Sequence, residues 1–222
     1  MDQLSGKRLR SRGLLRAGLG VTLTAAVLTC GSVIVLATGV RDMGARFESS
    51  FRHEREGSLE EALAEVLAVL SKHEDHYVAT LRAGWLSYCA GRHGEAVRFY
   101  RCAEKLEPKA LEPRLGAMLP LMAGKRWREA EETGLRVLRR APRSYLARSR
   151  LAYICFAHGR YAEAETWYRV VLADYPSDVE MRLGLGWTYA RQGRKGLARE
   201  QFEEVLSIRP SNESALLGLK ST

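Results

Sequence analysis

The chain has 222 residues, of which 46% are hydrophobic, and its formal net charge is +9. This length provides for one core-forming domain and little more. Residues 1–16 carry five basic residues and one acidic residue, so this tail accounts for four of the nine charges and the other residues for five. A positive charge diluted in this way does not favour a nucleic-acid partner.

The first elements along the chain are a basic tail at residues 1–16 and an apolar stretch at residues 17–40 that contains no charged residue. A helix over residues 17–40 would be about 36 Å long, which exceeds a hydrocarbon core of roughly 30 Å. We therefore predict a single transmembrane helix over residues 17–40. The basic tail predicts a cytoplasmic N-terminus, which places the rest of the chain on the opposite side, in the periplasm if the cell is bacterial.

Two other interpretations of this stretch are open. A signal peptide also begins with basic residues, but its apolar part usually spans about 7–15 residues, and "LATG" at residues 36–39 is a weak cleavage site. A lipoprotein attachment at Cys30 fits poorly with Thr29 before it and apolar residues after it. Small residues that recur every four positions could allow a helix–helix contact in the membrane, although Gly and Ala are frequent in membrane helices generally. These small residues are Gly18, Thr22, Ala26 and Cys30.

The remaining residues, 41–222, repeat with a period of 34. The phrase "GRHGEAVRFY" at residues 91–100 returns as "GRYAEAETWY" at residues 159–168, two periods later. The same step connects Pro108, Pro142, Pro176 and Pro210. The predicted repeats are 43–76, 77–110, 111–144, 145–178 and 179–212, followed by a cap at 213–222.

Each repeat has the pattern of two helices. In the repeat 77–110, apolar residues recur at helical spacing up to the turn, where Gly91 can adopt a positive φ. A second helix is expected from Gly94 to Leu106. A small residue at Gly84 lets the two backbones approach closely, while Tyr100 fills the space beside them. The predicted unit is a helix-turn-helix hairpin whose apolar face needs a neighbouring unit to cover it.

These residues resemble the tetratricopeptide repeat family, whose 34-residue unit has small residues at positions 8, 20 and 27 and proline at position 32. The match is clearest at Gly84, Ala96, Ala103 and Pro108, and it is loosest in the first repeat, where Glu74 stands in the place of the proline. The resemblance implies an all-α fold. It is a right-handed solenoid of about five helix-turn-helix repeats with a C-terminal capping helix, preceded here by the transmembrane helix.

In this family the first helix of each repeat lines the concave side of the solenoid, through positions 2, 5, 9 and 12. Positions 5, 9 and 12 of this chain predict an apolar, aromatic-rich groove that binds a partner protein's apolar helix or extended segment. The predicted groove residues are Phe47, Phe51, Leu81, Trp85, Tyr88, Leu115, Leu119, Met122, Tyr153, Phe156, Leu183 and Trp187. Alternatively, several of these side chains pack between neighbouring first helices. The Lys and Asn residues with which chaperone-binding members clamp a carboxylate are absent, so a terminal acidic motif is not the expected ligand.

Basic residues are expected at two places around this groove. Arg82, Arg150 and Arg191 are predicted near its rim, where they would steer a weakly acidic partner. The stretch "RVLRRAPRSYLARSR" at residues 136–150 contains no acidic residue, so it could contact anionic lipid headgroups or an acidic partner, although a solvated face is the commoner role of such a run. Its arginines are Arg136, Arg139, Arg140, Arg143, Arg148 and Arg150.

The sequence predicts no catalytic site, no metal and no cofactor. His73 and His76 in "HEDH" have a spacing that metal ligands use, but the segment lies between repeats, where a turn is expected and its acids can cap the next helix. No phosphate-binding glycine loop follows a strand pattern. Cys89, Cys102 and Cys155 have no metal-site spacing, and we expect free, mostly packed thiols.

The combined prediction is a membrane-anchored repeat scaffold that binds partner proteins through its concave groove and aids the assembly or stability of a multiprotein membrane complex. Two alternatives are a permanent structural subunit of one membrane complex and a secreted binding module that has lost its N-terminus.

Overall fold

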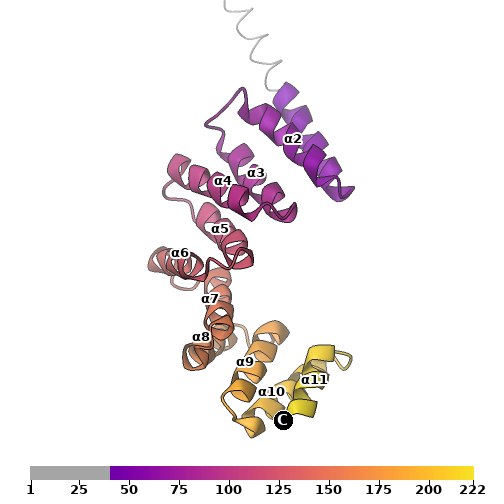
Figure 1. Ribbon diagram of the computed structural model, residues 1–222, viewed down its shortest axis with the longest axis vertical. Helices are drawn as coiled ribbons and strands as arrows, with labels where there is room; N and C mark the ends of the chain where they lie inside the picture. The colour runs from indigo at the N-terminus through magenta and orange to yellow at the C-terminus, as the bar shows by residue number, and fades with distance from the viewer. Residues whose placement is uncertain (1–40) are drawn as a thin grey trace, which may run out of the picture. The chain divides into compact units, whose positions relative to one another are not determined.

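The computed structural model describes residues 41–222 (Figure 1). The predicted transmembrane helix at residues 17–40 lies outside this range. Within the described range, no helix is both long enough and apolar enough to cross a bilayer. The chain divides into two compact units, residues 1–48 and 49–222, and the packing described below is that of the second unit.

The described chain is all-helical, with turns between the helices. Residues 41–55 are helical, and ten further helices follow within the described range. They are α2 (Leu59–Leu70), α3 (Tyr77–Cys89), α4 (His93–Leu106), α5 (Glu112–Ala123), α6 (Trp127–Arg140), α7 (Tyr145–Ala157), α8 (Tyr161–Asp174), α9 (Val179–Arg191), α10 (Lys195–Ile208) and α11 (Glu213–Ser221). The predicted stack of about five helix pairs with a terminal capping helix is therefore confirmed.

The turn inside each helix pair requires a residue with positive φ. Gly91 has φ +75°, and the next amide, that of Arg92, donates to the Ser87 carbonyl at 2.8 Å, which closes the end of α3. In the third repeat the same place is taken by Lys125, which adopts φ 58°. A left-handed conformation costs a non-glycine residue about 1–2 kcal/mol, so the stack imposes this backbone on a residue that disfavours it.

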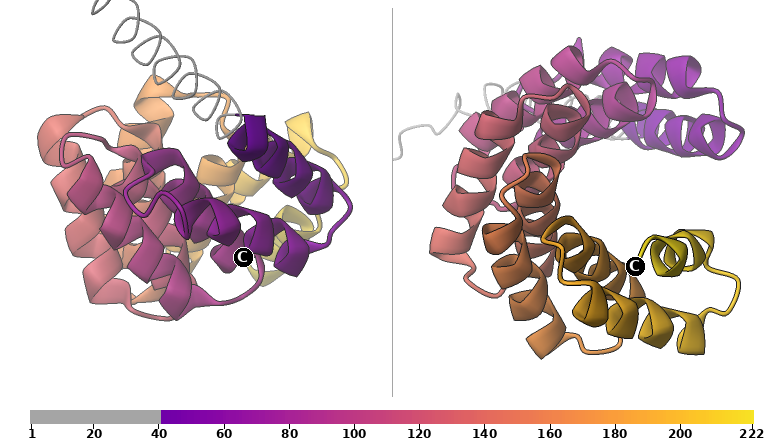
Figure 2. Two further views of the ribbon diagram at one scale, coloured as in Figure 1. Left: turned by 90° about the horizontal axis from the view of Figure 1, so that it is seen from above. Right: turned by 60° about the horizontal axis from the view of Figure 1, so that its bottom comes forward.

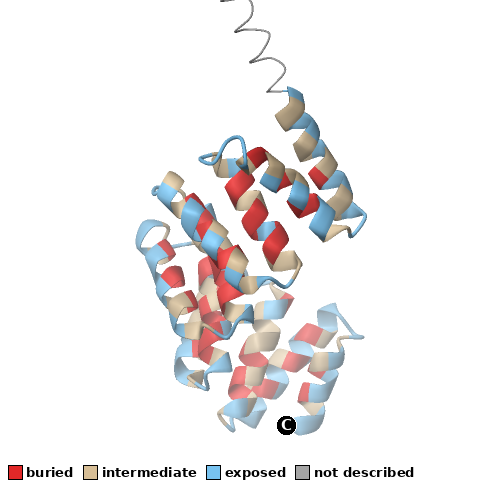
Figure 3. Ribbon diagram, turned by 45° about the horizontal axis from the view of Figure 1, so that its top comes forward, coloured by how far each residue is buried: buried red, intermediate tan, exposed pale blue. Residues whose placement is uncertain are grey.

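Residues 49–222 curve into an open arc (Figure 2). The first helices of successive repeats, α3, α5, α7 and α9, contact one another, and α9 also contacts α11. No comparable contact joins the second helices α4, α6, α8 and α10. Because the first helices are closer together than the second helices, the first helices lie on the inner side of the arc. Buried residues form stripes on the helix faces that meet between repeats (Figure 3).

The contacts between repeats depend on an aromatic ring of one second helix that lies against glycines of the flanking first helices. The Tyr100 ring on α4 lies against Gly84 of α3 and Gly116 of α5, and a Cβ placed on Gly116 would lie only 2.3 Å from Tyr100 Cε1. Later in the chain, a Cβ on Gly184 would lie 2.4 Å from the Tyr168 ring. These rings leave no room for a side chain at Gly116 and Gly184.

Phe202 repeats this arrangement at the end of the stack. The ring is fully buried, and a Cβ on Gly186 or Gly218 would lie 2.7 Å or 2.5 Å from it. The glycine of the capping helix α11 therefore accepts the same ring–glycine contact that joins the internal repeats. This contact fixes α11 as the cover of the last pair.

At two junctions between repeats the ring–glycine pair is replaced by a smaller residue on the second helix and an arginine on the next first helix. Gly116, Gly184 and Gly218 each follow a buried ring by sixteen residues, whereas Arg82 and Arg150 follow Val66 and Gly134 by the same interval. A large side chain thus stands on only one side of each junction. The half-buried Arg82 and Arg150 are the counterpart of the missing rings.

We predict that Gly116→Ala destabilises the protein by about 1–3 kcal/mol, because the new methyl group overlaps the Tyr100 ring in a close-packed junction. Gly94→Ala is the matched control: Gly94 lies in α4 and nothing would lie within 4 Å of its Cβ, so this change should be neutral or slightly stabilising. Urea unfolding followed by circular dichroism measures both. Equal midpoints for Gly116→Ala and the parent chain would contradict the packing described here.

Candidate protein-binding surface

Three aromatic rings on the inner side of the arc are exposed to solvent. Phe51, Trp85 and Tyr153 occupy the ninth position of their repeats, and they are 45%, 40% and 49% exposed. Rings of this size are more often buried, because each can remove a large apolar area from water. These three residues, called the aromatic wall below, are the predicted groove residues that remain open.

The wall is held rigid at its N-terminal end by a polar cluster. Trp85 Nε1 donates to Glu54 Oε1 at 2.6 Å. The same carboxylate pairs with Arg82 at 2.9 Å, and the Arg82 guanidinium stacks 3.7 Å from the centre of the Phe51 ring. Arg82 Nε also donates to Ser50 Oγ at 2.9 Å. Both exposed rings therefore have one face or edge fixed by charge-assisted contacts, which lowers the entropy that a partner must remove on binding.

The expectation that Arg82 and Arg150 lie at an exposed rim is wrong. The Arg82 side chain is only 9% exposed, and its charge is neutralised by Glu54. Arg150 is half-buried and donates to the Leu115 carbonyl of α5, and burial lowers the pKa of its guanidinium. This burial could not be predicted from the sequence, because arginines at the same helical spacing are ordinarily solvated. Arg191, the third of the set, is exposed.

The junction between α5 and α7 contains both a helix-internal proline and a side-chain donor. Pro120 lies inside α5 and has no N–H, so the carbonyl of Gly116 four residues earlier lacks its usual helical partner. The adjacent carbonyl, that of Leu115, accepts the hydrogen bond from Arg150. The interrupted helix and the buried arginine thus belong to one junction.

The other predicted groove residues are half-buried rather than open. Trp187 donates to Ser214 of α11 at 2.9 Å, and its ring lies edge-on to Phe202 at 5.2 Å. The Phe156 ring lies 5.8 Å from the Tyr161 ring. The half-buried residues are Leu81, Tyr88, Leu115, Leu119, Met122, Phe156, Leu183 and Trp187. Phe47 is also half-buried and belongs to the unit of residues 1–48.

Two exposed apolar residues were missed by reading only three of the four family positions. Val78 is 55% exposed and Leu146 is 44% exposed. Both occupy the second position of their repeats, which the family assigns to the concave side, so the signal that finds them was present in the sequence. They extend the apolar surface beside Trp85 and Tyr153 by about two helical turns towards the start of each first helix.

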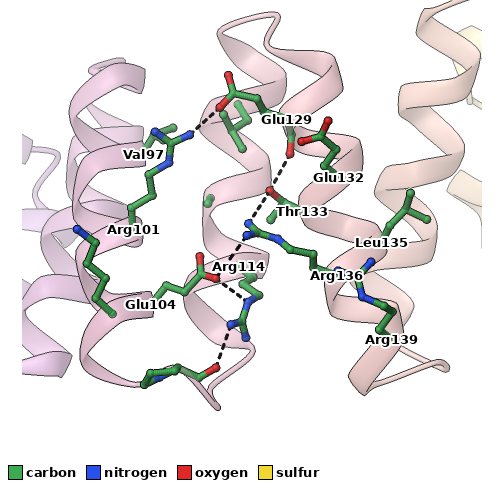
Figure 4. Close-up of a pocket in the computed structure, with 14 residues that line it drawn as sticks. Val97, Arg101, Glu104, Arg114, Glu129, Glu132, Thr133, Leu135, Arg136 and Arg139 are labelled. Atoms are coloured by element: carbon green, nitrogen blue, oxygen red, sulfur yellow. Dashed lines mark hydrogen bonds and ion pairs between the residues drawn. The ribbon is translucent and has the colours of Figure 1, made fainter.

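The arginine run at residues 136–150 contacts several different elements. Arg143 and Arg148 both pair with Asp174 of α8, at 3.2 and 2.8 Å. Arg140 donates to the Pro108 carbonyl at 3.2 Å. Arg136 and Arg139 line a cleft between α4 and α6 (Figure 4). Acidic partners that are distant in sequence therefore neutralise part of the run.

The "HEDH" segment forms a turn and a helix cap. His76 precedes α3, and its Nδ1 accepts a hydrogen bond from the Ala79 amide at 3.1 Å. The cap is thus the histidine and not, as was predicted, one of the neighbouring acids. His73 is exposed in the turn before it.

One thiol lies among carboxylates in the described chain. Ligand atoms of Cys155, Glu131 and Glu163 lie within 4.8 Å of one another. Arg160 pairs with both carboxylates, at 2.7 and 3.2 Å, and burial raises the pKa of the Cys155 thiol to about 11. A protonated thiol beside an arginine does not suit a cation. The three described cysteines are all free: Cys155 is buried, Cys89 is half-buried and Cys102 is exposed.

Comparisons with known families agree with the helical repeat. Residues 121–179 match one description of the tetratricopeptide repeat, and residues 156–221 match another. Residues 121–221 are therefore similar to tetratricopeptide repeats. Proteins built from tetratricopeptide repeats are usually non-enzymatic scaffolds. A comparison with curated proteins gave no match.

Several solved structures share the fold at low sequence identity. A MamA fragment from Desulfovibrio magneticus RS-1 has 19% identity and a TM-score of 0.70, covering 78% of this chain and 97% of the fragment. A tetratricopeptide repeat protein from Parabacteroides merdae has 18% identity and a TM-score of 0.72, covering 81% and 71%. YrrB, described as a tetratricopeptide repeat protein with an unusual peptide-binding site, has 19% identity and a TM-score of 0.65, covering 79% and 90%.

We predict that Arg82→Met loosens the first helix of the stack. The change removes the ion pair with Glu54, the hydrogen bond to Ser50 and the stack on Phe51, contacts that are together worth about 1.5–3 kcal/mol. Native-state hydrogen exchange should then be faster at residues 49–55 and unchanged in α8 to α10. Arg98→Met, at an exposed position of α4, is the control. Undiminished protection at residues 49–55 would show that the cluster does not hold this helix.

Proposed function

We propose that this protein is a protein-binding scaffold and that the aromatic wall holds an apolar helix or extended segment of a partner. The observation that carries the proposal is the exposure of Phe51, Trp85 and Tyr153, each at least 40% open at the same position of its repeat. Aromatic side chains of this kind supply most of the energy at protein interfaces. Their regular spacing along successive first helices suits an elongated ligand.

Rigidity of the wall supports the same function. Trp85 and Phe51 are already fixed by Glu54 and Arg82. A partner that covers them therefore gains the apolar contact without ordering these side chains first. The absence of an unpaired cation in this cluster favours an apolar partner segment over a carboxylate there. YrrB, which has the same fold, is described as having a peptide-binding site.

We further propose that residues 17–40 anchor the protein in a membrane, with the N-terminus cytoplasmic and the repeats on the opposite side. The uncharged length of this stretch and the five basic residues before it support this topology. A scaffold so anchored would hold its partner close to the bilayer and aid the assembly or stability of a multiprotein membrane complex.

Removing two rings of the wall should abolish partner binding. We predict that Trp85→Ala together with Tyr153→Ala lowers the recovery of the partner crosslinked in intact source cells by about tenfold or more. Helical content by circular dichroism should remain unchanged, because both rings are substantially exposed. Trp187 is left intact in this variant, since it packs on Phe202 and its loss would disturb α11.

Ile208→Ala is the matched control for that experiment, because Ile208 is 50% exposed and lies at the end of the second helix α10. Partner recovery should be unaffected by this change. Full recovery with the Trp85 and Tyr153 double variant would refute the assignment of the wall as the binding surface.

The anchor is tested by extraction of source-cell membranes at alkaline pH. The full chain should stay in the membrane pellet and its intact mass should include residues 1–40. A variant in which residues 1–40 are fused directly to a reporter protein should also stay in the pellet. Release of the full chain into the supernatant, or a mature mass without the N-terminal residues, would contradict an uncleaved anchor.

A further inference from the structure

A cleft of about 930 Å³ lies between the second helices α4 and α6, away from the aromatic wall (Figure 4). Its lining contains none of the predicted groove residues. Side chains of α4 form one wall, side chains of α6 form the other, and α5 contributes the floor. This cleft exists because consecutive second helices are spread apart on the outer side of the arc.

The floor of the cleft is apolar. Val97, Ala117 and Leu121 line it, and all three are buried. On the α6 wall, Leu135 is 40% exposed. An apolar side chain of a ligand that entered the cleft would therefore find apolar contacts at its base.

The acidic groups of the cleft are already paired. Glu104 pairs with Arg114 at 2.9 Å and with Arg136 at 3.7 Å. Glu129 pairs with Arg101 at 2.6 Å. Figure 4 shows these guanidinium groups directed at the two carboxylates.

The third acid, Glu132, lies 3.4 Å from Arg128, which is outside the cleft. No carboxylate of the lining thus remains to neutralise a further cation. The lining contains five basic and three acidic residues, so it has an excess of two positive charges.

Lys105 and Arg139 carry this excess. Both are exposed, and within the described chain neither side chain forms a hydrogen bond or an ion pair. One repeat period of 34 residues separates them, so they hold equivalent places in the last turns of α4 and α6. The equivalent residues of the other repeats are Ser71, Ala173 and Ser207. A pair of free cations at this register is therefore specific to the two helices that form the cleft.

We propose that this cleft is a second docking site, which binds an acidic amphipathic segment of a partner protein. Apolar side chains of the segment would cover Leu121 and Leu135, and its carboxylates would pair with Lys105 and Arg139. The glutamates in both walls oppose a continuous phosphate backbone, and the apolar floor offers it no contact. The site is independent of the aromatic wall, so one molecule can hold two partner segments at once.

The probe for this proposal is a synthetic helical peptide with leucines on one face and glutamates on its flanks. Its binding to the full chain in detergent is measured by fluorescence anisotropy. The same peptide with glutamine in place of glutamate is the uncharged control. Binding of the glutamate peptide should be about tenfold tighter than that of the glutamine peptide, and it should weaken with added salt.

The variant Lys105→Glu with Arg139→Glu should lower the affinity for the glutamate peptide by about tenfold or more. Lys195→Glu with Arg199→Glu changes the net charge equally on the exposed side of α10 and should leave the affinity unchanged. All four positions are exposed, and circular dichroism checks that both variants fold. Trp85→Ala with Tyr153→Ala should also leave this affinity unchanged.

Four results would overturn the proposal. They are equal binding of the two peptides, an equal loss in the two charge-reversal variants, a loss of binding in the aromatic-wall variant, and displacement of the bound peptide by single-stranded DNA or by vesicles with anionic lipid. Equal binding of the peptides or an equal loss in the charge-reversal variants would show that the attraction is unspecific. A loss in the aromatic-wall variant would show that the peptide binds at the aromatic wall. Displacement by DNA or vesicles would show that the cleft binds phosphate groups.

Discussion

The stack depends on a steric constraint, which is that a buried ring of a second helix needs a flanking first helix without a side chain at the point of contact. Tyr100 lies against glycines of α3 and α5, and Phe202 lies against glycines of α9 and α11. These contacts set how closely a second helix approaches the first helix of the next repeat. A repeat protein has contacts only between neighbouring units, so this distance determines the curvature of the whole arc of residues 49–222.

Two consequences for binding follow from this constraint. The first helices are drawn together, which arranges Phe51, Trp85 and Tyr153 along the inner side, where each is at least 40% exposed. The second helices are spread apart, which opens the cleft between α4 and α6. Where the ring is absent, Arg82 and Arg150 enter the junction instead, and Arg82 fixes the polar cluster that orients Trp85. Surface chemistry on both sides of the arc is thus determined by the size of a few buried side chains.

Much of the fold could be predicted from the sequence, because a 34-residue period, turn glycines and inter-repeat prolines are local signals. The positions of the helix pairs and the capping helix follow from them. Side-chain exposure could not be predicted in the same way: Trp85 and Trp187 occupy the same repeat position, yet Trp85 is open and Trp187 is packed on Phe202 beneath the cap. The burial of Arg82 and Arg150 likewise depends on the size of the residue sixteen positions earlier. That residue belongs to the preceding repeat, so the pattern of a single repeat does not predict the burial. The cleft could not be predicted from the sequence, because only the structure shows which basic side chains of its lining are paired with glutamates and which are not.

Where a junction contains a buried ring, the ring and the facing glycine are matched in size, and a double-mutant cycle of Gly116→Ala and Tyr100→Leu tests this most directly. The free energy of unfolding should show a favourable coupling of about 1–3 kcal/mol, because the alanine methyl group has room once the ring is shortened. Additive effects of the two changes, with no coupling, would contradict the account.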